Sequence, residues 1–148
     1  MALAESLDAA FKEALKGKQE VALSTLRMLR TAVRYREVEL KRPLTEAEIQ
    51  AVIASQGKQR REAAAEYRKV GRPDLAGKEE EEIIILLSFL PPQLSGEELE
   101  AEIAAVIAEV GAAGPKDLGK VMKSAMSRLG GRADGKAVQE IVKRRLGA

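Results

Sequence analysis

The chain has 148 residues, which is enough for one domain or two small ones, and it contains neither Cys nor His. Disulfides, zinc sites built on thiolate or imidazole, and catalytic triads that depend on Cys or His are therefore excluded. Charged residues make up 32% and aromatic residues 3% of the chain, which is typical of helical proteins and argues against a β-sandwich or an RNA-binding platform on which bases stack.

Charge is distributed unevenly, although the formal net charge is only +2. Residues 76–115 carry one Lys or Arg against nine Asp and Glu, whereas residues 116–148 carry nine against three. Two interpretations of the basic segment stay open, namely ordinary solvated helix faces and a patch that binds a polyanion.

Hydrophobic periodicity predicts three helices in the first 70 residues. Apolar residues at spacings of three and four predict helices over 3–16 and 18–41, and the capping box of Thr45 and Glu48 opens a third that runs to about residue 70. The second and third helices are joined by a tight loop, so we expect them to form a long antiparallel hairpin.

A fourth helix is expected after Pro73, with Asp74 as its N-cap. Its run from Ile83 to Leu87 is apolar on all sides, which predicts a buried central helix. Pro91 and Pro92 then stop the helix and mark a domain boundary, so the sequence predicts an N-terminal helical domain over 1–91 and a second domain over 92–148.

The second domain is predicted to be a three-helix bundle. A capping box of Ser95 and Glu98 opens a helix that runs to about residue 110, and two further helices are expected over 115–129 and 135–146. The predicted fold class is therefore all-α, with a long-helix hairpin or bundle followed by a three-helix bundle.

The sequence favours a cytoplasmic location. Residues 1–20 contain no continuous apolar run of the kind found in a signal peptide, and the apolar stretch before Pro91 is too short to span a membrane. We expect no membrane association, no metal and no cofactor.

The segment from Gly130 to Ala137 nearly matches the phosphate-loop pattern GxxxxGK[ST]. Ala137 stands where a hydroxyl should bind magnesium, and the segment follows a predicted helix rather than a strand, so a nucleotide-hydrolysing loop is not expected. Two interpretations stay open and are compatible: a structural turn capped by Asp134, and a turn that grips phosphate. The residues predicted to build this turn are Gly130, Gly131, Asp134 and Gly135.

Basic residues gather around this turn. Lys116, Lys120 and Lys123 recur at spacings of four and three, which places them on one side of a helix, opposite its apolar stripe. Together with Arg132 and Lys136 they are the candidate nucleic-acid-binding residues. The sequence nominates no catalytic residue.

Two other polar sets lie in the N-terminal half. Arg27, Arg30, Arg34 and Lys41 share a helix face that Glu37 is expected to neutralise in part. The polar residues Gln56, Gln59 and Arg60 suggest a network between the hairpin helices.

Six segments in the same order resemble the YqeY family, and together they extend over nearly the whole chain. They are LRMLR (26–30), KQRREA (58–63), YRKVGRPDLA (67–76), FLPPQLS (89–95), GKVM (119–122) and GRADGK (131–136).

The resemblance implies a small bacterial helical protein related to the tail of GatB, the B subunit of the glutamine-dependent amidotransferase that converts misacylated Glu-tRNA or Asp-tRNA. Residues 117–122 and 131–135 resemble a helix and turn of that tail. The tail's role, gripping tRNA, is what the resemblance implies for this chain. The catalytic cradle of GatB and the subunit that releases ammonia from glutamine have no counterpart here.

Three functions stay open from the sequence. The first is a tRNA-binding module or an accessory factor for a tRNA-modifying or aminoacyl-tRNA enzyme. The second is an amidotransferase-like carbon–nitrogen ligase that uses glutamine in complex with partners, although fold kinship does not transfer chemistry. The third is a protein-interaction scaffold.

Overall fold

The computed structural model describes residues 2–147, which form seven α-helices and one short 3₁₀ helix and contain no strand. The predicted all-α class is confirmed. The chain divides into two compact units, one ending at Leu90 and the other beginning at Pro91. Each unit is described by itself.

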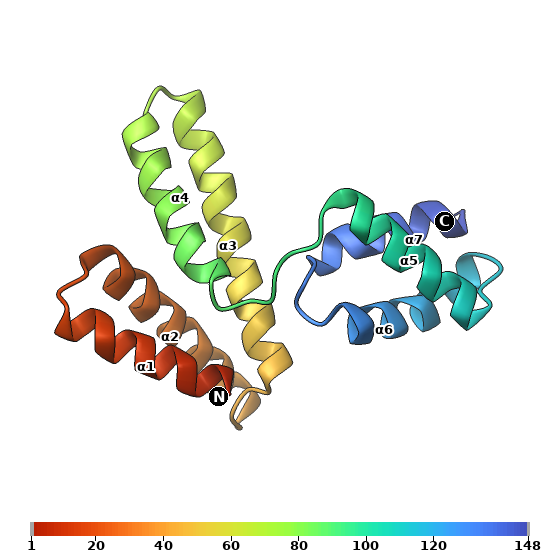
Figure 1. Ribbon diagram of the computed structural model, residues 1–148, viewed down its shortest axis with the longest axis horizontal. Helices are drawn as coiled ribbons and strands as arrows, with labels where there is room; N and C mark the ends of the chain where they lie inside the picture. Colours follow the sequence, from red (N-terminus) through yellow and green to blue (C-terminus); the bar gives the residue numbers. More distant parts are fainter. Residues whose placement is uncertain (1, 148) are drawn as a thin grey trace. The chain divides into compact units, whose positions relative to one another are not determined.

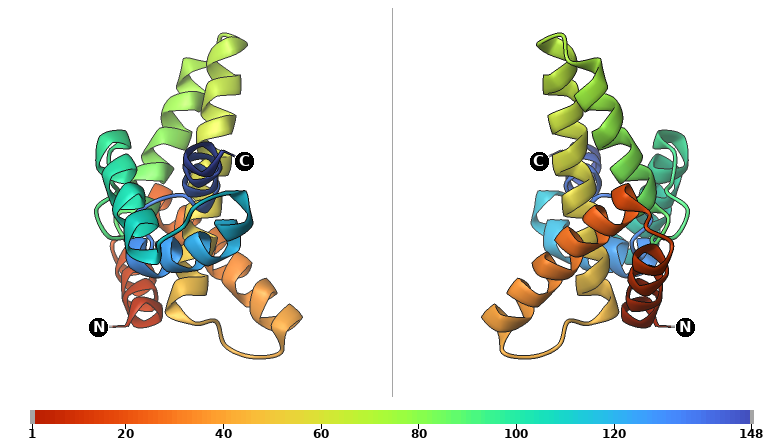
Figure 2. Two further views of the ribbon diagram at one scale, coloured as in Figure 1. Left: turned by 90° about the vertical axis from the view of Figure 1, so that its right-hand side faces the viewer. Right: turned by 90° about the vertical axis from the view of Figure 1, so that its left-hand side faces the viewer.

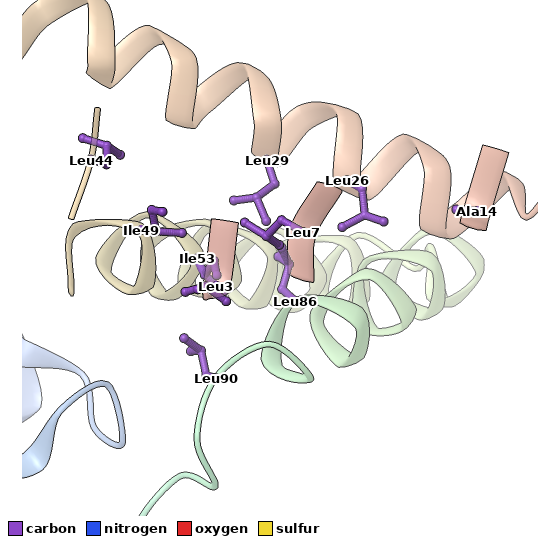
Figure 3. Packing of buried hydrophobic residues seen from close by; sticks show 10 residues of the cluster. All are labelled: Leu3, Leu7, Ala14, Leu26, Leu29, Leu44, Ile49, Ile53, Leu86 and Leu90. Carbon is purple, nitrogen blue, oxygen red and sulfur yellow. The ribbon is translucent and has the colours of Figure 1, made fainter. Parts of the chain in front are cut away.

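Two antiparallel helix pairs make up the N-terminal unit (Figure 1). Its four helices are α1 (Leu3–Lys16), α2 (Glu20–Leu40), α3 (Glu46–Lys69) and α4 (Pro73–Leu87). The buried side chains of Leu7, Leu29, Ile53 and Leu86 come from all four helices and meet in one core (Figure 3). Burying each of these side chains contributes about 1.5–3 kcal/mol, so this core holds the unit together.

The helix pairing differs from the predicted hairpin. The longest helix, α3, packs along α4, and it meets α2 over a much shorter length. Figure 2 shows α2 and α3 splayed apart toward the loop that joins them. The pairing of α3 with α4 is fixed by a short turn at Gly71, whose φ of +74° suits glycine, and by a buried ion pair between Arg60 and Glu82.

The expectation that α4 is a buried central helix is wrong. Ala76 and Leu86 are fully buried, but the side chain of Ile84 is 70% exposed. Because α4 packs against α3 and α2 on one side only, the other side of its apolar run faces solvent. The start of α4 also differs, because Pro73 occupies the first helical position and Arg72 the N-cap, so that Asp74 lies in the first turn.

The C-terminal unit consists of three α-helices and the 3₁₀ helix (Figure 1). They are α5 (Gly96–Val110), η1 (Pro115–Asp117), α6 (Leu118–Leu129) and α7 (Gly135–Leu146). Ile103, Val121 and Val142 are fully buried in its core. The capping box opens α5 as predicted, with the Ser95 hydroxyl and the Glu98 carboxylate each accepting a backbone N–H at 3.2 Å.

Across residues 2–147, none of the helices combines the length and the apolar character that crossing a bilayer requires.

Candidate nucleic-acid interface

The solvent face of α6 carries the predicted lysine stripe. Val121, Ala125 and Leu129 are buried on one side of the helix, and a period of 3.6 residues turns Lys120 and Lys123 to the opposite side. Both are exposed, as is Lys116 in η1, one turn before them. The helix therefore keeps these three side chains in solvent, where a polyanion can reach them.

The arginines of this unit are used differently. Arg128 pairs with Glu102 and Glu109 at 2.8 Å each, and Arg144 and Arg145 both pair with Glu100. The pKa of Glu100 is lowered from its ordinary value, first by the hydrogen bond from Arg145 and then by both guanidinium charges. Carboxylates of the acidic helix α5 thus form ion pairs with three arginines of the basic segment and with none of its lysines.

Within the described part of the chain, the four candidate lysines form no ion pair: Lys116, Lys120, Lys123 and Lys136. Asp117 lies close to two of them. Its pKa is lowered mainly because its carboxylate accepts the Ala113 N–H at 2.9 Å, and the charges of Lys116 and Lys120 lower it further. One carboxylate cannot offset two ammonium charges, so the segment around Asp117 keeps a net positive charge.

The backbone hydrogen bonds of the glycine turn after α6 all serve the local fold. Gly130 and Gly131 have φ of +41° and +79°, a left-handed conformation that favours glycine. Gly130 and Arg132 donate their N–H groups back to α6, to Met126 at 3.2 Å and to Leu129 at 2.8 Å. The turn ends the helix and reverses the chain toward α7.

Residues 93–94, which precede α5, hydrogen-bond to this turn. The Gln93 amide donates to the Gly131 carbonyl at 2.8 Å, and the Leu94 N–H donates to the Arg132 carbonyl at 2.9 Å. Arg132 is half-buried, and its charge helps to lower the pKa of Glu98, after the larger effect of the Ser95 hydrogen bonds. Of the five candidate cations, Arg132 is therefore the least available to a ligand.

The expected cap at α7 is only partly formed. Asp134 occupies the N-cap position, but its side chain accepts no hydrogen bond from the helix. The residue is exposed, so water can satisfy its carboxylate instead. Lys136 follows in the first turn of α7 and points away from the core residue Val138.

The near match to a phosphate loop lacks the required context. The segment follows α6, a helix, and no strand exists among residues 2–147. Within the described range 2–147, no group of three or more carboxylates is placed to hold a metal ion.

The arginine face of α2 departs from expectation. The Arg30 guanidinium lies 4.1 Å from the centre of the Phe11 ring and 3.8 Å from the Asp8 carboxylate. Glu37 does not pair with Arg34. Its carboxylate instead accepts the Leu44 N–H at 3.0 Å and so fixes the loop before α3.

The predicted glutamine network is wrong. Arg60 is bound by Glu82 at 2.8 Å and by the Met28 sulfur at 3.4 Å, and neither glutamine takes part. The Gln56 Oε1 is buried without a hydrogen-bond donor. Sequence reasoning also missed a groove beside Gln56, between α2 and α3. The sequence signal was weak: Met28 and Tyr35 are large residues seven positions apart, outside the predicted apolar stripe of α2.

These features define a small, all-helical protein of two units whose C-terminal unit carries a lysine-bearing solvent face. The family described as Yqey-like protein matches residues 4–146, so the chain belongs to that family, as the six segments indicate. An uncharacterized protein of Schizosaccharomyces pombe (strain 972 / ATCC 24843), C22F3.15, is 32% identical over 83 residues, which are 56% of this chain and 68% of that protein.

Proposed function

We propose that the protein binds tRNA through the lysine face, which we define as Lys116, Lys120, Lys123 and Lys136. The observation that carries this proposal is the sorting of charges in the C-terminal unit. Arg128, Arg144 and Arg145 form ion pairs with carboxylates of α5, whereas the four lysines remain exposed and unpaired in the described chain.

Exposed lysines at helical spacing suit phosphate contacts rather than base reading. Double-helical RNA is recognised largely through its shape, its phosphates and its 2′-hydroxyls, so no aromatic stacking platform is needed. The only aromatic residues are two Tyr and two Phe, all before residue 90. Family membership supports the same proposal, because the family resembles the tail of a tRNA-dependent enzyme.

The test is the salt dependence of tRNA affinity. Each phosphate contact releases counterions and contributes about 0.7–0.9 to the slope of log affinity against log salt. A variant with Lys116, Lys120 and Lys123 all changed to Gln is expected to bind more weakly and to lose about 2–3 from that slope.

The matched control changes Lys12, Lys16 and Lys18 to Gln. These exposed lysines lie in or just after α1, so the control has the same net charge as the test variant. The control is expected to keep the wild-type slope. If both variants lose affinity equally, net charge and not the lysine face determines binding, and the proposal is wrong.

A further inference from the structure

A groove of about 730 Å³ lies between α2 and α3 in the N-terminal unit. Its walls run from Arg27 to Glu39 on α2 and from Glu48 to Gln59 on α3, with lining residues at spacings of three and four on each helix. Each wall is therefore a continuous helix face about three turns long. The two helices splay apart toward their connecting loop (Figure 2), so they do not fill the space between them.

The α2 wall exposes an unusual amount of apolar surface. Met28 and Tyr35, which line the groove, are 52% and 71% exposed, and Val38, on the same helix just outside the lining, is 71% exposed. With Thr31 between them, these positions follow the 3-4-3 spacing of the seam by which helices pack in a coiled coil. Nothing in the described N-terminal unit covers this seam, so it has the geometry of a groove that can bind one more helix.

Charge along the groove indicates which helix fits. The lining carboxylates are already occupied, since Glu39 pairs with Arg36 and Glu48 pairs with Arg42, each at 2.9 Å. Arg27 lines the groove. Arg34 lies outside the lining, but it is exposed and follows Arg27 by seven residues, on the same flank of the seam. Neither forms an ion pair within residues 2–147. The Arg27 guanidinium lies 6.0 Å from the Phe11 ring centre, at the outer limit of a cation–π contact.

We propose that the groove binds an acidic amphipathic helix of a partner protein, whose apolar residues cover the seam and whose carboxylates meet Arg27 and Arg34. A second copy of this chain fits less well, because antiparallel packing of two α2 helices would set these arginines against each other. RNA also fits less well, because Ala32, Ala51 and Val52 line the groove with apolar surface that makes no phosphate contact. This proposal is independent of tRNA binding.

The test uses three labelled synthetic peptides, each about five helical turns long. The first has Leu at seam positions and Glu on the flanks, the second has Lys in place of Glu, and the third is a scramble of the first. Fluorescence anisotropy with the full chain measures their affinities. Only the Glu-flanked helix is expected to bind, and changing Arg27 and Arg34 to Gln should reduce its preference over the Lys-flanked helix.

Ala51→Glu places a carboxylate in the groove wall and is expected to weaken the Glu-flanked peptide at least about tenfold. Ala65→Glu is the matched control, because it makes the same change at an exposed site on the same helix, beyond the groove. It should bind as wild type, and circular dichroism checks that both variants are folded.

Each contrary outcome overturns the proposal. Equal binding of the Glu-flanked and Lys-flanked peptides removes the charge argument, and no binding of either removes the docking site. If sedimentation shows a wild-type dimer that Ala51→Glu dissociates, the occupant is a second copy. If Ala51→Glu instead weakens tRNA while no peptide binds, the groove belongs to an RNA surface.

Discussion

The buried ion pair between Arg60 and Glu82 allows a sharp test of how α3 and α4 are held together. Both side chains are less than 10% exposed, and Arg60 Nε lies 2.8 Å from Glu82 Oε2. Changing Glu82 to Leu leaves the guanidinium buried without its hydrogen-bonded carboxylate, which we expect to cost about 3–5 kcal/mol of unfolding free energy. That is a large part of the typical 5–15 kcal/mol stability of a domain.

The double variant Arg60→Met with Glu82→Leu should recover most of this loss. Replacing a buried pair by packed apolar residues is often neutral or stabilising by about 1–4 kcal/mol. Urea unfolding followed by tyrosine fluorescence reports on the N-terminal unit alone, because both tyrosines, Tyr35 and Tyr67, lie in it. A cost below about 1 kcal/mol for Glu82→Leu, which is the level of an exposed pair, would refute the reasoning. So would a double variant less stable than Glu82→Leu.

Three further predictions concern the C-terminal unit. A fragment of residues 91–148 is expected to fold alone and to show a cooperative thermal transition by circular dichroism; a non-cooperative melt would contradict it. In the full chain, Ser95→Ala should cost about 1 kcal/mol, because that hydroxyl caps α5, whereas Asp134→Ala should cost measurably less in urea titrations, because Asp134 makes no cap bond. The pKa values of Glu100 and Asp117 are lowered from 4.5 and 3.8, so their contribution to stability is complete above those values. This contribution is lost as the pH falls through the lower folded-state pKa values. If the stability of the 91–148 fragment does not fall as the pH is lowered below these values, the prediction is wrong.

Local patterns explain what the sequence predicts well. Spacings of three and four locate the buried faces, as with the lysines of α6 opposite Val121 and Ala125. Capping residues locate helix starts where a hydroxyl makes the expected bond, as Thr45 does with the Glu48 N–H at 3.2 Å. These signals depend only on residues within one or two turns of each other, so they do not depend on which helices pack together.

Partner choice explains what the sequence does not predict. Periodicity shows that α3 has a buried face, but not that this face meets α4, nor that Arg60 finds Glu82 across the interface. The ion pairs of Arg144 and Arg145 with Glu100 join groups more than 40 positions apart in the chain. The groove escapes prediction for the same reason, because an empty space arises from the angle between two helices rather than from either sequence.

NMR can map tRNA contacts directly on the isotope-labelled full chain, in a titration at low salt. We expect selective broadening or shifts at backbone amides of η1 and α6, from Lys116 to Lys123, and at the start of α7 around Lys136. These changes should reverse as salt is added, because phosphate contacts weaken with ionic strength. Changes confined to the N-terminal unit, or a spectrum that tRNA leaves unaltered at low salt, would contradict the proposed tRNA binding.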